Sequence, residues 1–173
     1  MCSSDLSLCT RVMEKIRSLP QPVLAQVHGV ATAAGCQLVA TCDLAVASEE
    51  ATFATPGVKI GLFCTTPAVA VTRAVPLKRA MEMLLTGEPI DAAEALAAGL
   101  VNRVVPRENL AEETMQLARR LLSFSGATLA MGKRAVYAQL SLPRPDAYAL
   151  AEQVMVANTL AHDGREEIGR AHV

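Results

Sequence analysis

Residues 29–35 (GVATAAG) carry almost no side-chain bulk, although an apolar run stands on either side of them. The run before them, VLAQVH at 23–28, is typical of a buried strand, and residues 34–41 predict a short helix that is apolar on all faces. Small side chains between two buried elements let another group approach the backbone closely. Two interpretations follow: a helix packed tightly on a strand, or a bound oxygen held by unpaired N–H groups at the start of the helix.

The composition restricts the classes of protein to which the chain can belong. A length of 173 residues, of which 51% are hydrophobic, suffices for one domain with a sizeable core. With a net charge of -1, the chain has no excess of basic residues that would bind a nucleic acid or a membrane surface, so neither is expected as a partner. The five cysteines are odd in number and contain no CxxC pair, which indicates reduced thiols in an intracellular protein.

Apolar periodicity and turn residues predict the secondary structure. Helices are expected at residues 6–19, 34–41, 66–74, 76–85, 92–98, 106–122, 127–140 and 146–161, and strands at 23–28, 44–47, 52–54 and 101–105. Pro76 is expected in the first turn of its helix, and Asp91 as the cap of the next helix. Because strands and helices come first and only helices follow, the pattern predicts an α/β core with a helical C-terminal region.

Most catalytic signatures are absent from the sequence. It contains no GxGxxG, GxxxxGK[ST], GxSxG or HExxH motif, and its histidines (His28, His162 and His172) are too scattered to predict a metal site. The remaining candidate is backbone chemistry at the start of the helix expected at 34–41. N–H groups there can stabilise an oxyanion, and losing one such donor costs other enzymes about 3–4 kcal/mol.

Three stretches of the chain resemble one family of enzymes. PVLAQVHGVATAAGCQLVATCDLAVAS, FATPGVKIGLF and RAVPLKRAMEMLLTGEPIDAAEALAAGLVNRVV are similar to segments of the enoyl-CoA hydratase/isomerase (crotonase) family, in order and nearly without gaps, from about Leu8 to Arg165. The details ATAAGCQL, FATPGV and GLFC favour one particular branch of that family. The resemblance implies a spiral of ββα units followed by C-terminal helices that build trimers, often paired into hexamers.

The same resemblance implies an acyl-CoA thioester as the bound molecule, with CoA as part of the substrate and no separate cofactor or metal. In the family, two backbone N–H groups hold the thioester carbonyl while an enolate forms, a chemistry of fatty-acid metabolism. One of these N–H groups falls on Ala34, where the family usually has Gly, and Ala31, Thr32 and Ala33 are expected to line the same pocket. An alanine at position 34 requires a negative φ there.

The chain departs from the family at both positions that carry its catalytic glutamates. Gln37 follows the Gly-Cys pair and Gly57 follows the Pro of the F-x-x-P stretch, so neither side chain can transfer a proton. Each acid–base group is worth about 10²–10⁴ in rate, so ordinary hydration is expected to be severely slowed. We therefore expect either weak or altered hydratase/isomerase chemistry, or a non-catalytic acyl-CoA-binding or structural subunit.

Three further residues have two open interpretations each. Phe63 is expected to form a wall of the acyl pocket or part of the core, and Cys64 to contact the acyl chain or to pack. Asp43 is a standard part of the family motif, where it looks structural, and catalysis is the alternative.

The resemblance also divides the chain. Residues 7–141 correspond to part of a crotonase core and 142–167 to the C-terminal helical region, while a preceding part with the first oxyanion donor and much of the CoA-binding surface is expected to be missing. The ends, 1–6 and 168–173, are expected to be non-native, because CSSDL and IGRAHV match the translation of a common sequencing adapter. The longer protein to which this chain is expected to belong should be an intracellular homotrimer or hexamer, located in the cytoplasm if it is bacterial and in mitochondria if it is eukaryotic.

Overall fold

The fold was obtained as a computed structural model, which describes residues 3–161. Their contacts divide the chain into two compact units. The first comprises the residues up to 17 together with 23–118, and the second comprises 18–22 together with the residues from 119 onwards. Both expected non-native ends lie wholly or partly outside the described residues.

Two small sheets form the centre of the first unit. One sheet has the strand order β1-β3-β6 and is parallel throughout; the other has the order β2-β4-β5, in which β2 and β4 are parallel and β4 and β5 antiparallel. The strands are β1 (Leu24–Val27), β2 (Val30–Thr32), β3 (Leu44–Ser48), β4 (Thr52–Ala54), β5 (Ile90–Asp91) and β6 (Arg103–Val105). Consecutive strands enter different sheets except for β4 and β5, which pair with each other, and this alternation confirms the expected spiral of ββα units.

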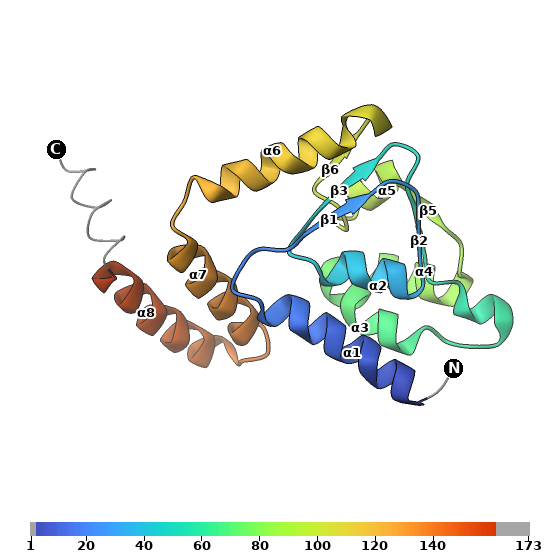
Figure 1. Cartoon of the computed structure of the whole chain (residues 1–173). Coiled ribbons are helices and arrows are strands. Elements are labelled where there is room, and N and C mark those ends of the chain that lie inside the picture. The colour runs from blue at the N-terminus through green and yellow to red at the C-terminus, as the bar shows by residue number, and fades with distance from the viewer. Residues whose placement is uncertain (1–2, 162–173) are drawn as a thin grey trace. The chain divides into compact units, whose positions relative to one another are not determined.

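Helices follow the strand pairs of the first unit (Figure 1). They are α2 (Ala34–Thr41), α3 (Thr65–Ala74), α4 (Leu77–Thr86) and α5 (Ala92–Ala97), together with most of α1 (Ser3–Ser18) and of α6 (Leu110–Leu122) and the short 3-10 turns η1 (Pro56–Ile60) and η2 (Arg107–Asn109). Helix α2 packs mainly on α3, and small side chains allow the close approach. The core is accordingly aliphatic: Phe53 is the largest side chain buried completely among the described residues, and Cys36 and Val71 are equally inaccessible.

Local chemistry explains several helix ends. Asp91 and Glu94 form a capping box at the start of α5, in which the Glu94 N–H donates to the Asp91 carboxylate at 2.8 Å and the Asp91 N–H donates to the Glu94 carboxylate at 3.0 Å. Gly87 closes α4 with a φ of 64°, where a side chain would be strained. The prediction for Pro76 was wrong by one position: it precedes α4 as the N-cap, because its ψ of 140° lies outside the helical region.

The second unit contains two helices that pack on each other, α7 (Gly126–Gln139) and α8 (Arg144–Leu160). The Ser125 side chain caps α7 by accepting from the Thr128 N–H at 3.2 Å, and the Thr128 hydroxyl lies 3.2 Å from the Asn158 side-chain oxygen. Neither helix has a fully buried residue. Their apolar side chains therefore remain largely accessible, as Tyr148 and Met155 illustrate.

Candidate functional site

The turn between β2 and α2 has an unusual backbone conformation. Ala33 is the N-cap of α2 with φ 48° and ψ -110°, and it is the one non-glycine with positive φ among residues 3–161. Its N–H donates to the carbonyl of Ala54 at 2.9 Å, directly beyond the parallel pair in which Thr32 lies opposite Ala54. The ends of two parallel strands thus fix the turn, and this tertiary hydrogen bond offsets the strain at Ala33.

Ala34 is the first residue of α2, and it is exposed. A residue in the first turn has no acceptor for its N–H within the helix, and the helix dipole adds partial positive charge at this end. The positive φ falls on Ala33, so the condition that alanine at position 34 needs a negative φ is met. The N–H of Ala34 is therefore oriented as a donor at the start of the helix.

Gln37 lies one turn further along α2. Gln37 is only 6% exposed, and its side chain lines a cleft. The carbonyl of Gln37 is satisfied separately, by the Thr41 hydroxyl at 2.7 Å. The amide of a glutamine side chain can both donate a hydrogen bond to a molecule in the cleft and accept one from it.

Gln37 faces a cleft of about 210 Å³ between α1, α2 and α3. Each helix contributes one face at helical spacing, since the residues from α1 and α3 follow an i, i+3, i+4, i+7 pattern. The lining comprises Thr10, Met13, Glu14, Arg17, Gln37, Thr41, Thr66, Val69, Ala70 and Arg73. Both apolar and charged side chains therefore reach this cleft.

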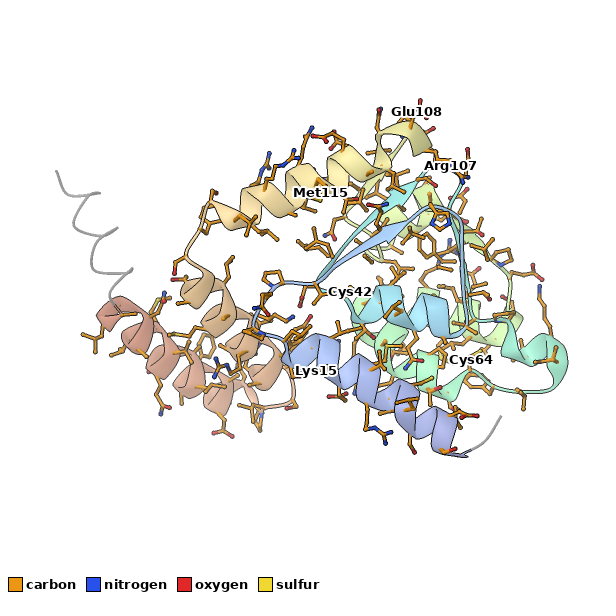
Figure 2. All side chains as sticks on the ribbon, in the orientation of Figure 1. Lys15, Cys42, Cys64, Arg107, Glu108 and Met115 are labelled. Atoms are coloured by element: carbon orange, nitrogen blue, oxygen red, sulfur yellow. The ribbon has the colours of Figure 1, made fainter. Side chains whose placement is uncertain are left out.

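The position of Gly57 in η1 is closed to any side chain. A Cβ atom there would lie 2.8 Å from the Cys64 Sγ and 2.8 Å from the Leu62 carbonyl oxygen. The thiol also accepts the Gly57 N–H at 3.3 Å. Cys64 precedes the first residue of α3, and in Figure 2 it lies at the opposite end of the α2/α3 pair from Cys42. Cys64 therefore packs against the very position where a side chain at 57 would begin.

Other predicted site residues lie outside the cleft. Ala31 is 6% exposed and lies in the core cluster, Thr32 is exposed, and Phe63 is 44% exposed. None of these three lines the cleft, and neither do Ala33 and Ala34. Their expected roles around a substrate remain predictions.

Two groups near α2 have defined structural environments. The Asp43 carboxylate accepts the Val23 N–H at 2.6 Å, and the Asp43 N–H donates to the Val23 carbonyl at 3.0 Å, so Asp43 ties the end of α2 to the start of β1. Burial, together with the nearby Cys64, raises the pKa of the Cys36 thiol to about 12. Cys36 is therefore a packing group, protonated at neutral pH.

Sequence reasoning missed the residues that α1 and α3 contribute to the cleft. The spacing of Met13 with Arg17, and of Val69 with Arg73, marks one face of each helix. That spacing does not say which two faces meet across a cleft, because the pairing depends on the tertiary structure.

The spiral of ββα units and the amide-bearing turn beside a cleft define the chain as a crotonase-type protein. The family model for enoyl-CoA hydratase/isomerase matches residues 7–172, and the chain belongs to this family. The branch that the sequence favoured is confirmed as well. Mitochondrial enoyl-CoA hydratase domain-containing protein 3 of Mus musculus is 57% identical over 160 residues, which cover 92% of the chain and 53% of that relative.

Solved structures agree with this assignment. The crystal structure of human enoyl-CoA hydratase domain-containing protein 3 is 55% identical with a TM-score of 0.90, covering 93% of this chain and 64% of that one. An enoyl-CoA hydratase from Mycobacterium smegmatis is 47% identical with a TM-score of 0.91, covering 93% and 63% respectively. The chain spans about half the length of the curated relatives that it matches.

Proposed function

We propose that the chain is the part of an acyl-CoA thioester-binding protein that carries the second oxyanion donor, in the hydratase/isomerase chemistry of fatty-acid metabolism. The observation that carries this proposal is the N–H of the exposed residue Ala34 at the start of α2, one turn from the buried Gln37. A thioester oxygen that accepts this N–H gains most when it becomes an enolate, because the donor is already in place.

The chain has no proton-transferring side chain at either position of the family's catalytic glutamates. Gln37 can orient a water molecule but cannot take its proton, and Gly57 contributes only backbone. The contact between Gly57 and Cys64 leaves no space for a carboxylate side chain at position 57. This contact favours the second candidate function, which is binding of an acyl-CoA, or a structural role beside a competent subunit, without turnover.

The test compares the purified chain with Ala34→Pro, and repeats the comparison on the longest product of its gene. Proline is tolerated at the first position of a helix and removes the N–H, and it also restricts the backbone of Ala33 before it, so the melting temperature of each variant without ligand is its own reference. Leu77→Pro at the first position of α4 is the matched control. We expect crotonyl-CoA to raise the melting temperature of the unsubstituted protein and of Leu77→Pro. It should not raise the melting temperature of Ala34→Pro.

Four outcomes are decisive. If crotonyl-CoA stabilises Ala34→Pro as much as the unsubstituted protein, the assignment of the Ala34 N–H as an oxyanion donor is wrong. If no CoA thioester stabilises the unsubstituted protein, the proposed function as a whole is wrong. Hydration of crotonyl-CoA at least about 10²-fold slower than by a family member with both glutamates agrees with the missing acid–base groups. Absence of turnover despite binding selects the second candidate function.

Partners and compartment follow from the same proposal. The vertebrate relatives are named as mitochondrial proteins, so we place a eukaryotic source protein in mitochondria and a bacterial one in the cytoplasm. We further propose a homotrimer or hexamer without metal, separate cofactor, nucleic acid or membrane partner. Across residues 3–161, no helix is both long and apolar enough to cross a membrane, and no cluster of His, Cys, Asp or Glu could hold a metal ion. Light scattering on the purified protein tests the assembly.

A further inference from the structure

Helix α4 carries more apolar surface than the core of the first unit covers. Successive residues of a helix are turned by about 100°, so residues four apart lie on one face. One side of α4 is buried and packs in the core through Ala80, Met83 and Leu84. The adjoining side is an exposed row of large apolar side chains, here called the α4 stripe: Leu77 (64% exposed), Met81 (38%) and Leu85 (58%). An exposed apolar stripe of this kind is typical of a surface that contacts another molecule.

The charged side chains along one flank of the α4 stripe are of both signs. Lys78 and Glu82 lie one turn apart on this flank, and both are exposed. Glu82 accepts a hydrogen bond from the Arg79 guanidinium at 2.7 Å through its Oε2 atom. Lys78 makes no ion pair with any residue between 3 and 161. A cation and an anion in fixed order therefore accompany the stripe, rather than charge of a single sign.

A second copy of α4 matches both the stripe and its charged flank. When two α4 helices lie antiparallel about a two-fold axis at Met81, Leu77 meets Leu85 of the second copy, and the reverse contact follows by symmetry. Lys78 then lies about 3 Å along the helix axis from Glu82 of the second copy, on the same side of the contact, because each residue rises about 1.5 Å. A uniformly acidic or basic partner matches only one of these two charges, whereas a second copy matches both.

We propose that the α4 stripe is a two-fold contact surface between copies of this protein, with apolar side chains at its centre and two Lys78–Glu82 ion pairs at its edge. A ten-residue helix is only about 15 Å long, so one such contact is smaller than the roughly 1,200 Å² of a stable interface. Association of the chain alone should therefore be weak, and stronger where an assembly repeats the contact. On the homotrimer proposed above, three such contacts join two trimers into a hexamer, and none of them depends on the acyl-CoA function.

The main experiment exchanges the two charges and measures sedimentation over a concentration series, for the full chain and for the longest product of its gene. Lys78→Glu and Glu82→Lys each place like charges opposite one another, so each variant alone should dissociate about tenfold more readily than the unsubstituted protein. A mixture of the two variants restores both ion pairs and should associate as the unsubstituted protein does. Neither a general change of charge nor local unfolding around Arg79 can produce that recovery.

Further variants test the apolar part of the contact. Leu85→Glu should raise the dissociation constant at least about tenfold, because it places a charge within the contact. Leu96→Glu on α5 is the matched control and should change nothing, although Leu96 is also 43% exposed. In a protein that also carries Cys2→Ser and Cys9→Ser, Met81→Cys should form a disulfide-linked dimer on oxidation, because the two-fold axis brings the two copies of this residue together. Leu96→Cys in the same protein should not.

Recovery in the mixture, together with cross-linking at Met81 and none at Leu96, supports the two-fold contact. No association of the unsubstituted protein, or no recovery in the mixture, overturns it. Equal cross-linking at the two positions assigns the association to general apolar contact and also overturns it. If the chain associates through α4 but the longest gene product does not, another part of that protein covers the stripe and the proposal is wrong. The crotonyl-CoA experiment tests the proposed function separately from all of these results.

Discussion

The backbone N–H of Gly57 donates to the Sγ atom of Cys64 at 3.3 Å, and the same sulfur lies 2.8 Å from where a Cβ at position 57 would stand. The Leu62 carbonyl closes the site from another direction, also at 2.8 Å. A main-chain oxygen cannot rotate away as a side chain can. The absence of a carboxylate at this position is therefore built into the surrounding loop.

Gly57→Glu should lower the free energy of unfolding by about 1–3 kcal/mol and should not create hydratase activity, because the new side chain displaces backbone. Adding Cys64→Ala should recover only part of the stability, since the Leu62 carbonyl remains. Gly29→Ala is the control: it has no atom within 4 Å of the added Cβ and should change stability by less than about 0.5 kcal/mol. Urea unfolding measures all three, and a stable, active Gly57→Glu protein would show that the loop yields.

Ala33→Gly should stabilise the chain by about 1 kcal/mol, because glycine adopts the φ of 48° without strain. The neighbouring change Ala34→Gly serves as the control. Ala34 has helical backbone, so glycine there should give no gain and cost up to about 1 kcal/mol. Thermal or urea unfolding of the two variants should therefore shift in opposite directions, and equal shifts would refute the strain at Ala33.

The Cys36 thiol should make the free energy of unfolding depend on pH in alkaline solution. Its pKa rises from 9.0 to about 12 on folding, mainly through burial. Below pH 9 the thiol is protonated in both states. Between about pH 9 and 12 the unfolded chain loses this proton while the folded chain keeps it, so stability should fall by about 1.4 kcal/mol per pH unit. Urea unfolding across this range should show a shallower slope for Cys36→Ala, and identical slopes would count against the shifted pKa.

Asp43→Ala should destabilise the chain by about 1–3 kcal/mol, because the Val23 N–H loses its carboxylate acceptor. Asp43→Asn keeps an oxygen at that position and should cost clearly less. The ratio of these two losses, measured by urea unfolding, distinguishes a hydrogen-bonding role from a catalytic one. A variant with unchanged stability and lost activity would assign Asp43 to catalysis instead.

Much of the fold was predictable because its signals are local. The periodicity and breakers around α2 and β4 gave their observed bounds, and Asp91 was correctly expected as a cap. The strand β2 was missed because two of its three residues are exposed and only backbone pairing with β4 holds it. The short β5 depends in the same way on β4, to which it pairs.

The candidate site was predictable only in part. The position of Gln37 followed from the family resemblance, and it does line the cleft. The positive φ of Ala33 and the contact between Gly57 and Cys64 arise from tertiary hydrogen bonds, which no local pattern encodes. Arg17 and Arg73 belong to helices that are far apart in the sequence, so their convergence is likewise a property of the folded chain.

The central position of β3 in its sheet has a consequence for how the chain must fold. Its pairing with β1 spans about one helix of sequence, but on its other side Ala47 pairs with Val104. During synthesis that second edge of β3 stays open until β6 has left the ribosome, and open strand edges recruit other chains. The nascent protein is therefore exposed to strand-edge association during this interval, and slowing translation between these two strands should increase its aggregation.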